Sequence, residues 1–153
     1  MKHKLKLMLN HSLSEIYERN LLQLKDEINL YNDENGLWSV RGQVSNSAGN
    51  LCLHLIGNLN HFIGATLGNT GYVRHRESEF TSKNIPRENL LTEIDKTIEV
   101  IKNMFSKMKE EDFAKEFPLL KHDKRVSTEE MLLHLLAHLN YHIGQINYHR
   151  RLG

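Results

Sequence analysis

Apolar residues recur every three or four positions along four long stretches of the chain, which is the spacing that gives an α-helix one apolar face. These stretches cover residues 12–31, 47–67, 86–111 and 128–150. No stretch of useful length alternates apolar and polar residues as a half-buried strand does. The pattern therefore predicts an all-α protein, a four-helix bundle whose helices are each about 20 residues long.

Helix-breaking residues lie between these stretches and predict long connecting loops over residues 32–46, 69–85 and 112–126. Pro86 suits the first position of the third helix, where its missing amide hydrogen is harmless. Ser127 and Glu130 have the Ser-x-x-Glu spacing of a capping box, so we expect the fourth helix to begin at Thr128. Loops of about 15 residues permit crossover connections as well as simple up-and-down ones.

The second helical stretch contains three glycines, Gly49, Gly57 and Gly64. Each should cost about 1 kcal/mol relative to alanine in the interior of a helix. A residue without a side chain lets a neighbouring helix or a ligand approach the backbone closely. We therefore expect close packing against this helix to offset the cost.

Composition and charge narrow the class of protein. The 153 residues are 39% hydrophobic and 25% charged, which predicts one ordinary globular domain over residues 1–153. The formal net charge is +1, so no overall field attracts nucleic acid or an anionic membrane. We expect neither as a partner.

The single cysteine, Cys52, excludes an internal disulfide and favours a reducing compartment. Residues 1–13 lack the continuous apolar core of a signal peptide. No apolar run approaches the roughly 18 residues of a membrane span. These features together predict a cytoplasmic protein.

Histidine is unusually frequent, with ten in the chain. On a helix, residues four apart differ by about 40° and share one face. In the fourth predicted helix, a polar strip about 80° wide beside the apolar face contains His134, His138, His142, Gln145 and His149. The second helix has a similar strip with His54, Asn58 and His61. If the two strips face each other, the bundle contains a polar pocket.

Two imidazoles one helical turn apart can bind one metal ion, and a third from a neighbouring helix leaves a coordination position open. Three nitrogens suit Zn²⁺ or Ni²⁺ better than Mg²⁺ or Ca²⁺, and without a carboxylate ligand Fe²⁺ is less favoured. A single histidine at an apolar edge is usually a hydrogen-bonded core residue, but three at this spacing favour a metal site.

Spacing alone leaves the ligand set open. The pair on the fourth helix is either His134 with His138 or His138 with His142. The partner on the second helix is either His54 or His61, which lie about 10 Å apart along the helix and cannot easily share one ion.

Three segments of the chain resemble the DinB-like superfamily, metalloproteins that include bacillithiol transferases. They are GNLCLHLIGNL at 49–59, RHRESEF at 74–80 and HLNYHIGQI at 138–146, and the resemblance extends over nearly the whole chain. It implies a four-helix bundle of the DinB-like type, a homodimer and the ligands His54, His138 and His142. His61 is then a pocket or core residue, and His134 an ordinary polar one.

The RHRESEF segment resembles a sub-branch of that superfamily whose activity is mostly undefined. One interpretation is a loop pinned by ion pairs. The other is that Arg74, Arg76 or Glu79 lines the mouth of the pocket and contacts a charged substrate. Asn58 and Gln145, which share the histidine strips, are further pocket candidates.

The resemblance implies a metal-dependent transferase that joins a small-molecule thiol to an electrophile, because a cation stabilises the reactive thiolate. A metal-dependent hydrolase is one alternative, with Glu79 or a spare histidine as its base. A non-catalytic binding or assembly protein stabilised by the metal is another. Cys52 lies about 160° around the helix from His54, so we expect a core residue and no protein nucleophile.

Overall fold

The computed structural model describes the backbone of residues 2–153 and the side chains of residues 9–153. It contains the α-helices α1 (Lys2–Asn29), α2 (Ala48–Leu59), α3 (Arg76–Thr81), α4 (Arg87–Lys107) and α5 (Thr128–Leu152). The described part of the chain forms no strand and only two isolated β-bridges. The expected all-α, bundled architecture is therefore confirmed.

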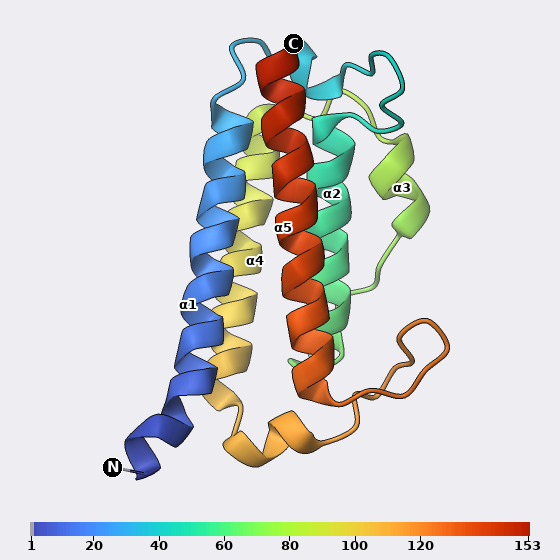
Figure 1. The fold of residues 1–153 in the computed structure, drawn as a ribbon. Coiled ribbons are helices and arrows are strands. Elements are labelled where there is room, and N and C mark those ends of the chain that lie inside the picture. The colour runs from blue at the N-terminus through green and yellow to red at the C-terminus, as the bar shows by residue number, and fades with distance from the viewer. Residues whose placement is uncertain (1) are drawn as a thin grey trace.

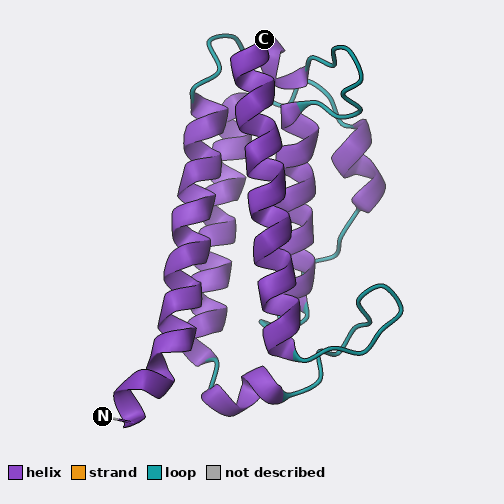
Figure 2. Cartoon of the chain, in the orientation of Figure 1, coloured by secondary structure: helices purple, strands orange, loops and turns teal. Residues whose placement is uncertain are grey.

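The four long helices lie side by side, and the short α3 lies outside them against α2 (Figures 1 and 2). Figure 1 shows that α1 and α5 run in one direction and that α2 and α4 run in the other. Two helices in sequence, α2 and α4, are thus parallel. The connection between them returns along the outside of the bundle and carries α3 beside α2.

Several predicted bounds need correction. Helix α1 begins at Lys2 and not near residue 12, because Lys, Leu and Met continue a helix well even where no apolar face is evident. Pro86 is the cap before α4, and Arg87 is the first helical residue. The second predicted helix divides into α2 and a π-helical segment, Asn60–Ala65.

Helix α4 ends at Lys107 and not near residue 111. Three short helical segments lie wholly or partly in stretches that the sequence predicts as loops. They are α3 and the 3₁₀ helices Glu34–Trp38 and Glu110–Ala114. Each has five or six residues, which is fewer than two turns and too short to produce an apolar periodicity.

The core lies between the four long helices, where their apolar faces meet. The apolar stripe of α4 is buried from Leu90 to Phe105, and Met108 is only partly buried. In α1, Ile16 is half-buried, and the large residues Tyr17 and Leu21 fill the core. The Tyr17 hydroxyl donates to the Leu132 carbonyl oxygen and so joins α1 to α5.

Close packing against the glycines of the second helix is confirmed. A Cβ at Gly49 would lie 2.7 Å from three ring atoms of Trp38. The indole therefore rests on the backbone of α2 where any other residue would exclude it. This contact fixes the long loop between α1 and α2 against the first turn of α2.

Serine caps begin both helices that carry the histidine strips. The Ser47 hydroxyl accepts from the Asn50 amide, and the Ser127 hydroxyl accepts from the Glu130 amide. The expected start of α5 at Thr128 is confirmed. The Glu130 carboxylate binds Lys121, 3.1 Å away, rather than completing the expected capping box.

None of the described helices is both long enough and apolar enough to cross a membrane.

Candidate metal centre

Three imidazoles converge where α2 faces α5. The Nε2 atom of His138 lies 3.2 Å from Nε2 of His54 and 3.1 Å from Nε2 of His142. One ring nitrogen from each of the three lies within 4.8 Å of the other two. Tetrahedral ligands about 2.0 to 2.1 Å from an ion lie about 3.3 Å apart. The three histidines are therefore close enough to bind one metal ion.

Two of these rings are oriented by a partner at the other nitrogen. His54 Nδ1 donates to Glu79 Oε1 over 3.1 Å, and His142 Nδ1 donates to Gln145 Oε1 over 2.7 Å. A neutral imidazole with its proton on Nδ1 has its lone pair on Nε2. Both lone pairs are thus directed at the shared centre, which is how outer partners commonly prepare histidines for a metal.

The electrostatics of the site favour uncharged rings. Burial lowers the pKa of His138 to about 4, and the neighbouring His142 and His54 rings add to the shift. Burial also lowers the pKa of His54 and of His142, while hydrogen bonds to Glu79 and Gln145 oppose the shift. At neutral pH all three imidazoles are therefore uncharged, and each has one nitrogen lone pair free for a metal.

Glu79 is held between His54 and an arginine. Its side chain is only 6% exposed, and Arg74 donates to both of its oxygens, Nε to Oε2 and Nη2 to Oε1, each over 2.9 Å. The guanidinium also lies 6.0 Å from the centre of the Phe62 ring. Both oxygens of the Glu79 carboxylate thus accept hydrogen bonds. Arg74 and Glu79 form an ion pair of the kind that one interpretation of the RHRESEF segment expects.

Gly57 makes room for this carboxylate. A Cβ at Gly57 would lie 1.8 Å from Glu79 Oε2, far closer than two such atoms can approach. The carboxylate therefore lies directly on the backbone of α2, one turn after His54. This contact explains a glycine in the middle of an otherwise apolar helix.

A buried asparagine fastens α3 to the start of α2. Asn50 Nδ2 donates to the carbonyl oxygens of Glu79, 3.0 Å away, and Ser82, 2.8 Å away. Asn50 Oδ1 accepts from the Ser47 hydroxyl over 2.6 Å. These hydrogen bonds fix the position of Glu79 along the axis of α2. Asn50 was not among the predicted site residues, although it lies in the segment that resembles the superfamily.

The aromatic ring of Phe80 was also missed. It packs on the His54 ring with 4.9 Å between centroids, and the Arg76 guanidinium lies over the Phe80 ring, 5.5 Å from its centre. Arg76 therefore contacts Phe80 and is exposed. Its position next to the ion pair, but outside it, leaves the substrate-contact interpretation for Arg76 as a prediction.

Two buried polar atoms near the strips lack a hydrogen-bond partner among the described residues, His138 Nδ1 and Asn58 Oδ1. Because no side chain orients His138 through Nδ1, its position depends on packing within α5. Asn58 is buried one turn beyond His54, in the predicted strip.

The remaining histidines of the strips lie elsewhere. His61 packs edge-on against Phe62, and His134 packs edge-on against His122 of the preceding loop. His149 joins two elements near the end of α5, with Nδ1 2.7 Å from the Tyr31 hydroxyl and Nε2 2.9 Å from the Ser39 carbonyl oxygen. The geometry thus selects His138 with His142, and His54 over His61.

Cys52 is fully buried in the core, as expected. Burial raises the pKa of its thiol to about 12. The thiol therefore stays protonated at neutral pH and is not a nucleophile.

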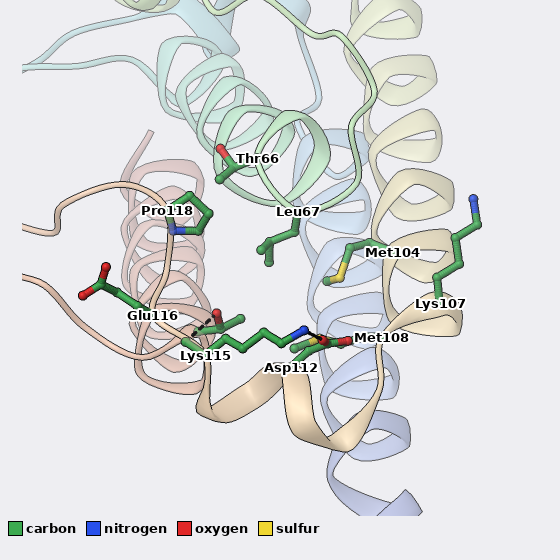
Figure 3. Close-up of a pocket in the computed structure, with 10 residues that line it drawn as sticks. Thr66, Leu67, Met104, Lys107, Met108, Asp112, Lys115, Glu116 and Pro118 are labelled. Carbon is green, nitrogen blue, oxygen red and sulfur yellow. Dashed lines mark hydrogen bonds and ion pairs between the residues drawn. The ribbon is translucent and has the colours of Figure 1, made fainter.

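An open cavity of about 560 Å³ adjoins the histidine cluster. His142 and Gln145 line one end of it, and Tyr148 and Leu152 line another part. A second cavity, of about 270 Å³, lies where α5 begins, about 15 Å along the helix from His138. Figure 3 shows that Leu67, Met104 and the Asp112–Lys115 ion pair line it. None of the described residues that line the second cavity is a histidine, so it is separate from the candidate centre.

The donor set fits a divalent ion of intermediate softness. Three neutral imidazole nitrogens with converging lone pairs repel one another unless a proton or a cation lies between them. Nitrogen ligands suit Zn²⁺ and Ni²⁺, and the absence of a carboxylate from the cluster makes Mg²⁺ and Ca²⁺ poor fits.

Comparison with known proteins places the chain in a family without assigning it an activity. A search of curated proteins found no match. Residues 8–152 match the family described as "Protein of unknown function (DUF1572)". Because this match includes the three converging histidines and nearly all of the bundle, the chain belongs to the DUF1572 family.

Proposed function

We propose that this protein is a DinB-like metalloprotein that uses one divalent ion to transfer a small-molecule thiol to an electrophile. The observation that supports this function best is the convergence of Nε2 atoms from His54, His138 and His142. The resemblance to the superfamily of the bacillithiol transferases supplies the reaction class. Zn²⁺ and Ni²⁺ are the proposed ions.

The side chains of the site would have separate roles. His54, His138 and His142 hold the ion, and Glu79 and Gln145 orient two of these ligands through Nδ1. A bound divalent ion supplies Lewis acidity, which favours the thiolate form of a thiol near it. Arg74 neutralises Glu79, so the carboxylate can be buried beside the centre without an unpaired charge.

In the proposed reaction, the thiol S–H bond and the bond from carbon to its leaving group break, and one S–C bond forms. With an alkyl halide, the thiol proton and the leaving halide pass to solvent. With an epoxide, the oxygen stays on the opened product and takes up a proton. No oxidant or reductant is required. The protein supplies no nucleophile, which agrees with the burial of its single cysteine.

Thiol transfer fits the site better than hydrolysis does. In metal-dependent hydrolases a base commonly lies beside the attacking water, in addition to the ion. Glu79, which is the carboxylate expected as the base of a hydrolase, accepts hydrogen bonds from His54 at Oε1 and from Arg74 at both oxygens. His61 and His134 lie outside the cluster. Transfer of a metal-activated thiol needs no such base.

The test is a conjugation assay on protein loaded with Zn²⁺ or Ni²⁺, with bacillithiol, cysteine and coenzyme A offered against a panel of alkyl halides and epoxides. We expect mass spectrometry to detect a thioether above the uncatalysed rate, and we expect His138→Ala to abolish it. The matched control His134→Ala removes an imidazole one turn earlier on α5 and should stay active. Absence of product from protein of verified metal content would refute the proposal, and a rise in melting temperature on metal binding without turnover would favour a structural role.

A further inference from the structure

The face of α5 beyond the candidate centre exposes several large apolar side chains. Tyr141 and Tyr148 are each 65% exposed, and Leu152 is 81% exposed. These residues are seven and four positions apart, so they share one side of the helix. Val44, from the loop before α2, faces the same cavity and is 46% exposed. Apolar surface concentrated in this way commonly marks a binding site.

This surface is continuous with the histidine cluster. His142 and Gln145 line the cavity between α5 and the loop, together with Leu51 at the start of α2. The volume of about 560 Å³ lies in the range of about 300 to 1,000 Å³ that is usual for small-molecule sites. A molecule in this cavity would therefore reach the side of His142.

The lining carries no formal charge. Of the eleven described residues that line the cavity, none is Asp, Glu, Lys or Arg. The guanidinium of Arg151 lies against the Tyr148 ring, 5.4 Å from its centre, and is not among the lining residues. Away from the ion proposed at the His142 end, an ionic group in the cavity would lose hydration without gaining a lining partner of opposite charge. The part of the occupant that lies away from this ion should therefore be uncharged.

We propose that this cavity binds the uncharged aromatic or aliphatic body of the electrophilic substrate and presents its reactive carbon at the His142 end. The proposal rests on the proposed function and narrows its substrate class to neutral, apolar electrophiles. The polar thiol then approaches from the side of the histidines, and the electrophile from the side of Tyr141 and Tyr148. The transfer step itself is unchanged.

The test measures binding without turnover. The full chain is titrated in its metal-free form, so that no bound cation can attract an anion. The probes are N-phenyl-1-naphthylamine, a neutral aromatic fluorophore, and 1-anilinonaphthalene-8-sulfonate, which carries the same ring system and a negative charge. We expect the neutral probe to bind at least tenfold more tightly. Replacing Tyr141 or Tyr148 by alanine should weaken its binding about tenfold. Leu133→Ala, which truncates an exposed residue of α5 away from the cavity, should leave it unchanged.

Equal or tighter binding of the sulfonate, or wild-type binding by both tyrosine variants, would overturn the proposal. The proposal would also be overturned if size-exclusion chromatography shows a wild-type dimer that Tyr148→Ala converts to monomers. A second copy of the chain would then occupy this face. The two proposals can fail separately. Normal probe binding without thiol transfer would refute only the function, and transfer to small electrophiles without probe binding would refute only the cavity assignment.

Discussion

The two ring nitrogens of His54 have different partners, and this difference defines the site. Nδ1 donates to a buried carboxylate, whereas Nε2 faces the Nε2 atom of His138. Helical spacing predicts which histidines share a face, but it cannot choose between His54 and His61 on that face. The choice depends on where α2 meets α5, which is a property of the assembled bundle.

The role of Glu79 could not be derived from spacing at all. It is 25 residues from His54, in a stretch predicted as a loop, and no periodicity relates a loop residue to a helix. The sequence showed only that two arginines and a glutamate are close together, which favoured an ion pair and left a substrate contact as the alternative.

Replacing Glu79 tests its orienting role. We expect Glu79→Gln to weaken Zn²⁺ binding about 10-fold to 100-fold, because the amide cannot hold both the His54 proton and the Arg74 charge as the carboxylate does. The measurement is a competition titration against a chromophoric chelator. Glu77→Gln removes an exposed carboxylate from the same short helix and should have no effect. An unchanged affinity in Glu79→Gln would show that the carboxylate does not orient the ligand.

At the scale of elements, the decisive feature is the close approach of α3 to α2. The glycines of α2 indicated that something would pack closely there, but not what. The structure shows Trp38 at Gly49 and Glu79 at Gly57. Helix α3 itself was not predicted, because its six residues are mostly polar and form no apolar face.

Two glycine substitutions should have opposite effects on stability. Gly57→Ala places a methyl group into the Glu79 carboxylate, so we expect a loss of about 1 to 3 kcal/mol. Gly144→Ala lies in α5, where a Cβ meets no atom of the described residues within 4 Å. It should gain about 0.5 to 1 kcal/mol from higher helix propensity.

Urea denaturation of the metal-free variants measures both changes. If Gly57→Ala were as stabilising as Gly144→Ala, the carboxylate would not lie on the backbone of α2.

At the scale of the whole molecule, the crossover between α2 and α4 makes the site possible. It returns along the bundle and brings α3 beside α2 (Figure 1). Glu79 can therefore bind both His54 and Arg74. The sequence predicted the four long helices and permitted a crossover, but loop length alone did not determine the direction of each helix. The homodimer implied by the superfamily stays a prediction, which sedimentation of the loaded protein can test.

The clustered rings should make the metal-free protein sensitive to acid. The pKa of His138 is about 4 in the folded chain, against about 6.5 when unfolded. The folded state therefore binds fewer protons between these values, and its stability declines as the pH falls. We expect the urea midpoint of chelator-treated protein to be highest above pH 6.5 and to decrease toward pH 5.

The variant His138→Gln isolates this contribution, because it removes the titrating ring at similar size. Its urea midpoint should decrease less between pH 7 and pH 5 than that of the wild type. Parallel pH profiles for the two proteins would contradict the expected role of His138.

The central claim is that three imidazoles bind one cation, and calorimetric titration of metal-free protein with Zn²⁺ tests it most directly. We predict one ion per chain for the wild type and for His134→Ala, and loss of this binding in His54→Ala, His138→Ala and His142→Ala. Circular dichroism of each variant confirms that the helices remain. Binding of Zn²⁺ by His138→Ala with wild-type stoichiometry and affinity would contradict the account.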